Sequence, residues 1–229
     1  MQRTRALRMA FCLTFTLGLG LAQTSTAPHT KDGHPDLSGV WIPDGKFSGD
    51  FSKALLPGEK ITMLPAAEKI FKETKRKDDP VNRCLPMGLP RLSTLPEKFV
   101  QTPAQLVILE EGDIHTFRLV YLGNRPHPAE PGPSWYGDSI GKWDGDTLVV
   151  DTIGFNDRTW LDAVGHPHTE KLHVTERYRR PDAATLVRTV TVEDPGAYAK
   201  PFKLEGTFKL APATREIREN YCYKSPVDK

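Results

Sequence analysis

The second half of the chain is dominated by segments in which apolar and polar residues alternate. In Phe202–Leu210 every second residue is apolar or glycine, and the residues between them are Lys, Glu or Thr. This period of two is typical of a β-strand with one buried face. The same alternation, or a compact apolar run, predicts further strands at Leu37–Ile42, Gln105–Glu110, Ile114–Leu122, Asp138–Trp143, Thr147–Phe155, Lys171–Arg180, Thr185–Glu193 and Thr214–Tyr223.

Short connections join most of these segments. The turn Asp144-Gly145-Asp146 lies between two of them, and Asp-Gly at such a place is a strong hairpin signal because glycine takes a positive φ without a Cβ clash. Short loops between successive strands favour antiparallel neighbours. We therefore expect an all-β fold, an antiparallel up-and-down barrel of about eight or nine strands, because closure removes exposed edges.

One helix precedes the strand-rich half. Apolar residues fall at helical spacing in Pro65–Asp78, Pro65 suits a first helical turn, and Pro80 ends the pattern. Asn82–Lys98 is rich in proline and predicts an ordered but irregular wrap.

The first 22 residues have the pattern of a secretion signal. Three arginines precede the apolar run Met9–Leu21, and small residues end at Ala22, where we place cleavage. The run is too short to span a membrane. Residues 23–36 would form a flexible lead-in, and residues 37–229 a single barrel domain that includes the helix. We expect a secreted or periplasmic protein with no membrane span after cleavage, although an uncleaved anchor is an alternative.

The charge limits the possible partners of the protein, and the cysteine content indicates its compartment. Removing the three arginines of the leader, which has no acidic residue, lowers the formal charge from +2 to −1. A near-neutral surface argues against nucleic acid as a partner. Cys84 and Cys222 remain after cleavage and would pair in an oxidising compartment. Such a bridge would stabilise the fold by about 4–5 kcal/mol.

Strand alternation also suggests which polar groups line the interior. It places His115, Phe117 and Tyr121 on one face of Ile114–Leu122, and Glu176 and Tyr178 on the more apolar face of Lys171–Arg180. A buried carboxylate must pair, bind a ligand or titrate. One interpretation makes His115 and Glu176 a catalytic acid and base, with Phe117, Tyr121, Trp143 and Tyr178 contacting a ligand. The alternative is structural, with Glu176 paired to Arg188 and His115 a satisfied wall residue.

The loop Asn156–Thr169 carries the densest set of reactive side chains. His166, His168 and Glu170 alternate, so an extended loop would place all three on one face as a zinc or iron site. The alternative is catalysis without a metal, because imidazole titrates near neutral pH. Asp157 is a further catalytic candidate, with a structural role in the loop as the equal alternative, whereas Asp162 is better explained as a structural cap. Trp160 is either a ligand-binding lid or a cover for the barrel end. No Gly-x-Ser-x-Gly elbow, phosphate loop or dinucleotide fingerprint is present.

Two resemblances add to these expectations. Gly39-Val40-Trp41 resembles the Gly-x-Trp signature of lipocalin-like barrels. That resemblance implies that Trp41 closes one end of the barrel beneath an arginine from a late strand, either Arg215 or Arg218.

A second resemblance rests on six short motifs: SIGKW at 139–143, GDTLVVDT at 145–152, GFND at 154–157, PHTE at 167–170, RCLP at 83–86 and DPGAY at 194–198. Through these motifs the chain resembles a family of secreted bacterial proteins that has no settled activity. Relatives in that family often have His where this chain has Asp138, which weakens a role for that position.

The leading functional hypothesis is a secreted, cofactor-independent enzyme, a lyase, isomerase, cyclase or hydrolase. It would perform acid–base chemistry on a small apolar or aromatic molecule in a barrel cavity. The alternatives are a periplasmic lipocalin-like carrier that leaves its ligand unchanged, and a structural envelope protein.

Overall fold

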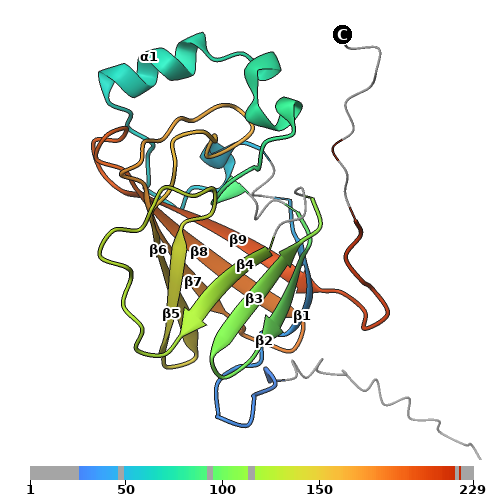
Figure 1. The fold of residues 1–229 in the computed structure, drawn as a ribbon. Helices are drawn as coiled ribbons and strands as arrows, with labels where there is room; N and C mark the ends of the chain where they lie inside the picture. The colour runs from blue at the N-terminus through green and yellow to red at the C-terminus, as the bar shows by residue number, and fades with distance from the viewer. Residues whose placement is uncertain (1–25, 46–48, 92–94, 113–116, 220–221, 223–229) are drawn as a thin grey trace, which may run out of the picture.

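The structure, a computed structural model, describes residues 26–45, 49–91, 95–112, 117–219 and 222, and its strands form a closed barrel (Figure 1). Neighbouring strands follow one another in the sequence around the whole ring. β1 (Gly39–Pro43) closes it by pairing with both the second strand and the last. The others are β2 (Glu97–Gln101), β3 (Gln105–Glu110), β4 (Phe117–Leu122), β5 (Asp138–Asp144), β6 (Thr147–Ile153), β7 (His173–Arg179), β8 (Thr185–Glu193) and β9 (Phe202–Leu210).

The expectation of a strictly antiparallel barrel is wrong at one place, because β4 and β5 run parallel. The reason is parity. Strands that alternate in direction close a ring without a parallel pair only when their number is even, and this ring has nine. The connection between β4 and β5 must therefore return along the barrel, and residues 123–137 form this crossover (Figure 1).

Helical segments and loops cover one end of the barrel, which we call the loop end (Figure 1). α1 (Pro65–Glu73) begins at the expected proline but ends before residue 78, because Thr74 has an extended ψ of 134° and its hydroxyl bonds to the carbonyl of Ile70. Short 3₁₀ turns also belong to this cover, among them η1 (Phe51–Lys53), η2 (Arg76–Asp78) and η3 (Pro80–Arg83). No helix in the described ranges is long and apolar enough to cross a bilayer.

Two strand expectations are corrected. β2 lies where the irregular wrap was expected to end, and it pairs with β1 and β3. Residues 214–219 of the expected last strand contain no strand, so β9 takes the place beside β1. The central hairpin is confirmed, with Gly145 at a φ of +57° in its turn.

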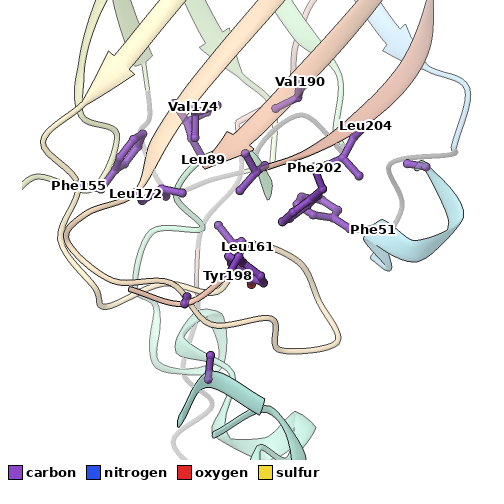
Figure 2. Close-up of a cluster of buried hydrophobic side chains, with 14 residues drawn as sticks. Phe51, Leu89, Phe155, Leu161, Leu172, Val174, Val190, Tyr198, Phe202 and Leu204 are labelled. Atoms are coloured by element: carbon purple, nitrogen blue, oxygen red, sulfur yellow. The ribbon is translucent and has the colours of Figure 1, made fainter. Parts of the chain in front are cut away.

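The interior of the barrel has three layers. At the loop end lies an apolar cluster, the loop-end core, in which strand residues such as Val174, Val190 and Leu204 face Leu161 and Tyr198 from the loops (Figure 2). Nearer the β5–β6 hairpin lies a second cluster, the hairpin-end core, which consists of Leu37, Trp41, Phe99, Leu106, Ile108, Val120, Leu148, Val150, Tyr178, Leu186 and Phe208. The strand positions between the two clusters hold buried charged residues, which we call the charged layer: Glu97, Arg118, Glu176 and Arg188.

Trp41 occupies the hairpin end of the barrel. It is fully buried and donates from Nε1 to the carbonyl oxygen of Leu37 at 2.8 Å. The guanidinium of Arg180 lies 5.1 Å from the centre of its ring. The expectation of Arg215 or Arg218 over this tryptophan is therefore wrong, because those residues belong to no strand and Arg215 pairs with Glu111 instead.

The segment expected to be a flexible lead-in is described from residue 26. It makes a turn against the hairpin end, where the ring of His34 stacks on Trp143 with 4.5 Å between centroids. The leader, residues 1–22, lies outside the described residues.

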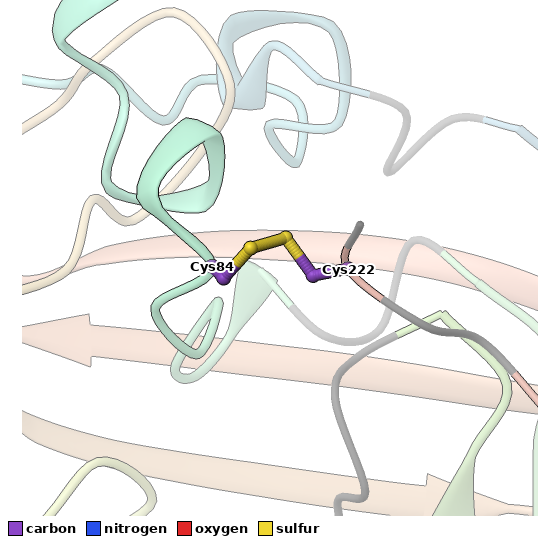
Figure 3. Close-up of a disulfide and its surroundings, with 2 residues drawn as sticks. All are labelled: Cys84 and Cys222. Carbon is purple, nitrogen blue, oxygen red and sulfur yellow. A yellow bond between two sulfur atoms is a disulfide. The ribbon is translucent and has the colours of Figure 1, made fainter. Parts of the chain in front are cut away.

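The expected disulfide is present. Cys84, at the end of η3, is bonded to Cys222 across a separation of 138 residues, with their Cα atoms 5.5 Å apart (Figure 3). This bridge ties the C-terminal segment to the loop end of the barrel.

Candidate functional site

The loop between β6 and β7 is folded around one buried carboxylate, Asp162. Its Oδ1 accepts hydrogen bonds from the amides of Val164, Gly165 and His166 at 3.1–3.2 Å, and its Oδ2 accepts from the amide of Phe51. The imidazole Nδ1 of His166 lies 2.7 Å from Oδ2. Burial alone would raise the pKa of Asp162, but these bonds and the His166 charge lower it. Asp162 thus has the structural role expected from the sequence.

This turn places Thr159 and His168 next to one another. The amide of Leu161 donates to the carbonyl of His166 at 2.9 Å, which brings the two arms of the loop side by side. One step further out, Thr159 Oγ1 lies 2.8 Å from His168 Nε2. Both residues are buried, with exposed fractions of 5% and 6%.

The hydrogen bonds of His168 define its tautomer. Nδ1 lies 3.2 Å from the carbonyl oxygen of Thr169, which only accepts, so Nδ1 carries the proton. Nε2 then has a free lone pair and accepts from the hydroxyl of Thr159. Burial lowers the pKa of His168 below its ordinary value, although the charges of Asp194 and Asp157 oppose this. At neutral pH the imidazole is therefore a neutral, oriented proton acceptor.

Neighbouring residues hold this pair in position. Asp194 accepts from the amide and the hydroxyl of Thr169 at 2.6 and 2.7 Å. The hydroxyl of Tyr198 donates to the carbonyl of Pro167 at 2.7 Å. On the other side Gly88 lies so close that a Cβ placed on it would be 2.6 Å from Thr159 Oγ1.

The pair opens into a cleft of about 610 Å³ at the loop end. Three residues singled out in the sequence meet there: Asp157, Trp160 and His168. The lining is mixed in character. Its remaining members are Ile70, Asp78, Pro80, Arg83, Leu85, Arg158, Thr159 and Pro167.

Two guanidinium groups belong to this lining. Arg83 and Arg158 are exposed, and neither forms an ion pair with another residue in the described part of the chain. Arg158 instead lies over the ring of Trp135 at 4.7 Å. The carboxylates of Asp78 and Asp157 balance these charges formally, so the cleft offers groups of both signs.

The three side chains considered as an alternative metal site, His166, His168 and Glu170, do not come together. His166 is bonded to Asp162 and stacks on Phe71 with 4.5 Å between ring centroids. His168 is bonded to Thr159, and Glu170 is exposed. Within the described ranges, no three His, Cys, Asp or Glu side chains are arranged to hold a metal ion.

Glu176 lies inside the barrel, as expected, where it contacts two arginines. Its Oε2 is 2.5 Å from Arg118 Nη2, and Arg188 Nη2 contacts Oε1. Arg188 also bonds to Glu97 at 2.9 Å. Burial by itself would raise the pKa of Glu176, but the two guanidiniums lower it to about 2. The structural alternative, pairing with Arg188, is present in the structure, and Tyr178 donates to the same carboxylate at 3.2 Å.

The interior positions expected for the β4 side chains are wrong. Arg118 and Val120 point inward, so Phe117 lies on the outer surface with an exposed fraction of 58%. Tyr121 is outside as well, beneath the guanidinium of Arg125 at 4.2 Å. The prediction assigned the wrong face of Ile114–Leu122 to the barrel interior, because the aromatic residues Phe117 and Tyr121 lie together on the outer face. His115 lies outside the described residues.

A second polar cluster fixes the crossover to the outside of the barrel. His127 Nδ1 lies 2.8 Å from Asp138 on β5, and its Nε2 lies 2.8 Å from Asp151 on β6. Arg125 bonds to both oxygens of Asp138, and His173 lies 2.6 Å from Asp151. Partial burial would raise the pKa of Asp151, but the two histidines lower it.

Sequence reasoning missed Thr159, Arg118 and His127. Thr159 has no motif of its own, and its partner is identified only by the fold of the loop. Arg118 is a charged residue in an apolar strand, and this pattern signals a buried ion pair. His127 lies in a proline-rich connection that gives no indication of its partners.

No protein-family model, curated protein or solved structure matches this chain.

Proposed function

We propose that this protein is a secreted enzyme that performs acid–base chemistry on a small molecule in the loop-end cleft, with His168 as the base. The observation that carries the proposal is the pair formed by His168 Nε2 and the Thr159 hydroxyl, 2.8 Å apart, at the wall of that cleft. A neutral imidazole fixed by a partner on its second nitrogen is the usual arrangement of a general base.

The convergence of distant motifs supports the same place. Three of the motifs through which the chain resembles the secreted bacterial family contribute to the cleft: RCLP through Arg83 and Leu85, GFND through Asp157, and PHTE through His168. Asp157 is close enough for its charge to raise the pKa of His168, and it would stabilise the imidazolium formed during reaction. This proposal moves the site from the barrel interior to the loop end.

Glu176 serves the framework in this proposal. A carboxylate with a pKa of about 2 is a weak proton acceptor at neutral pH, and its oxygens already contact two arginines. His115 takes no part in it. The substrate would place an apolar or aromatic portion against Trp160, Ile70 and Leu85, and a polar portion toward Arg83 or Arg158. A cleft of about 610 Å³ has the size of sites that bind one small molecule.

Secretion and barrel type are also part of the proposal. The Cys84–Cys222 bridge is typical of proteins in an oxidising compartment, which agrees with the leader pattern of residues 1–22. The buried Trp41 beneath Arg180 supports a lipocalin-like barrel, with the arginine supplied by the residue that follows β7. No metal or cofactor is assigned to the reaction.

The proposal is tested by turnover of a panel of small aromatic esters, lactones and enolisable ketones. We expect His168→Gln to abolish the turnover that the wild type shows, and His29→Gln, at an exposed histidine outside the cleft, to leave it unchanged. The wild-type rate should rise as pH increases through the lowered pKa of His168 and then level off. Full turnover by His168→Gln would remove His168 from the mechanism.

A carrier function is the second candidate, and one observation favours it. Arg118 Nη1 and Arg188 Nε are buried and have no hydrogen-bond partner among the described residues. A polar group of a ligand inside the barrel would satisfy them. Native mass spectrometry of the protein purified from its source would decide. One molecule retained chemically unchanged, and released by Arg118→Met, supports the carrier.

A further inference from the structure

We infer that Thr159 is the nucleophile of an acyl-transfer reaction and that the substrates of the cleft are esters of small carboxylic acids. This inference rests on the proposed function, because it uses His168 as the base. Its starting point is the pair of contacts made by the imidazole: Thr159 Oγ1 at 2.8 Å from Nε2, and the Thr169 carbonyl oxygen at 3.2 Å from Nδ1.

These contacts show why His168 acts on a substrate through Thr159. Both ring nitrogens already have partners, so a substrate proton reaches the imidazole only by way of the hydroxyl at Nε2. A hydroxyl that donates to a base, which is itself oriented by a third group, is the arrangement that activates serine and threonine nucleophiles. Here a backbone carbonyl takes the place that a carboxylate holds in the Ser-His-Asp triad.

The surroundings select this hydroxyl over its neighbours. The hydroxyl of Thr169 donates to Asp194 at 2.7 Å, and Ser139 lies in the barrel interior, where it bonds to Arg118. Thr159 lines the cleft, and Gly88 packs against its oxygen where any larger side chain would displace it. The low exposure of Thr159 keeps the base dry, which preserves its neutral form.

The reaction balances with water as the only co-reactant. Thr159 Oγ1 bonds to the ester carbonyl carbon as its proton passes to His168 Nε2. The bond to the leaving alcohol then breaks, and the alcohol takes that proton. Water attacks the acyl-threonine, gives a proton to Nε2, and releases the carboxylic acid as Oγ1 takes the proton back. Negative charge on the carbonyl oxygen would be stabilised by the guanidinium groups of Arg83 and Arg158.

The experiment uses p-nitrophenyl acetate as the probe. The full-length mature protein is mixed with the ester at neutral pH, quenched in acid, and examined by intact mass and peptide mapping. We expect one acetyl group, located on Thr159, and release of p-nitrophenol. Thr159→Val, which keeps the shape and removes the hydroxyl, should lower the rate at least about 100-fold. Thr159→Ser should retain an acetylated hydroxyl, and Thr26→Val, at an exposed site, should match the wild type.

The possible results separate the two proposals. If His168→Gln abolishes turnover and Thr159→Val does not, the nucleophile is overturned and the base remains. If both variants keep wild-type turnover, both proposals fall. If the wild-type protein releases no p-nitrophenol and carries no acetyl group, the assignment of Thr159 as the nucleophile is wrong. Turnover of the wider substrate panel then tests whether His168 is the base. Should Thr159→Val fail to fold, the site of acetylation in the wild type and in Thr159→Ser decides.

Discussion

Replacement of Glu176 by glutamine gives the sharpest test of how the barrel interior is stabilised. Glutamine keeps the shape of the side chain and removes the charge that two buried guanidiniums contact, and among the described residues only Arg188 then keeps an ion pair, the one with Glu97. The pKa of Glu176 falls from 4.5 to about 2 in the folded state. A shift of this size corresponds to about 3 kcal/mol of folding free energy at neutral pH, as an order of magnitude. We therefore expect Glu176→Gln to be less stable by about 3 kcal/mol.

The measurement is urea unfolding with the disulfide intact, followed by circular dichroism. Because the folded-state pKa of Glu176 is depressed, its contribution is fully present above about pH 4.5 and is lost as pH falls toward 2. The difference in unfolding free energy between the wild type and the variant should therefore shrink as pH falls from about 4.5 toward 2. Burial and the charge of Glu176 both raise the pKa of Glu97, so Glu97 contributes with the opposite sign and is itself altered when Glu176 becomes glutamine. Glu193→Gln, at an exposed position, should change stability by less than about 0.5 kcal/mol.

A double variant tests whether the charges act as a unit. Arg118→Met alone should cost about 3 kcal/mol, because it leaves Glu176 with one arginine. Ser139 and Thr152, which lose their bonds to Arg118, still bond to each other at 3.0 Å. Combining Arg118→Met with Glu176→Gln should cost well below the sum of the two, because the Arg188–Glu97 pair remains balanced. Additive losses, or a Glu176→Gln protein as stable as the wild type, would refute the reasoning.

Three further predictions follow from other parts of the structure. In a nuclear magnetic resonance titration His168 should protonate below its ordinary pKa of 6.5, and its contribution to stability should be lost as pH falls through that lowered value; titration at or above 6.5 would contradict the buried, neutral imidazole. Replacing Cys84 and Cys222 by serine should lower stability by about 4–5 kcal/mol in the same urea assay, and an unchanged midpoint would show that the bridge adds nothing. His127→Phe should cost about 2 kcal/mol and speed proteolysis within residues 123–137, whereas cleavage at the wild-type rate would mean that the crossover is held by other contacts.

The sequence predicts local features well and long-range partners poorly. The hairpin at Gly145, the start of α1 at Pro65 and the inward face of β9 all follow from short-range patterns, and all are present. The pairing of Cys84 with Cys222 is predicted because they are the two cysteines that remain after the leader is removed. β2 was missed because Glu97 and Lys98 break the apolar pattern, although Glu97 is buried and pairs with a strand far along the chain.

The candidate site likewise contains residues that the sequence predicts and residues that it does not. Asp157, Trp160 and His168 stand out in the sequence as a loop rich in reactive groups, and the fold brings them into one cleft. Thr159 could not be identified, because its partner is defined by a turn that the Asp162 carboxylate organises. For β4, the period of two is equally regular on either face, so only the ion pair of Arg118 reveals which side is buried.

The charged layer also helps to fix the register between neighbouring strands. In a barrel filled only with aliphatic side chains, sliding one strand past its neighbour by two residues keeps apolar groups inside, so several alignments compete. Here Tyr178 lies opposite Arg188 and Glu176 opposite Val190, which places the carboxylate one step diagonally from its guanidinium. A two-residue slip that moves Glu176 opposite Val192 separates these charges in a dry interior and becomes costly. The buried charges thus disfavour a misalignment that a purely aliphatic interior would tolerate.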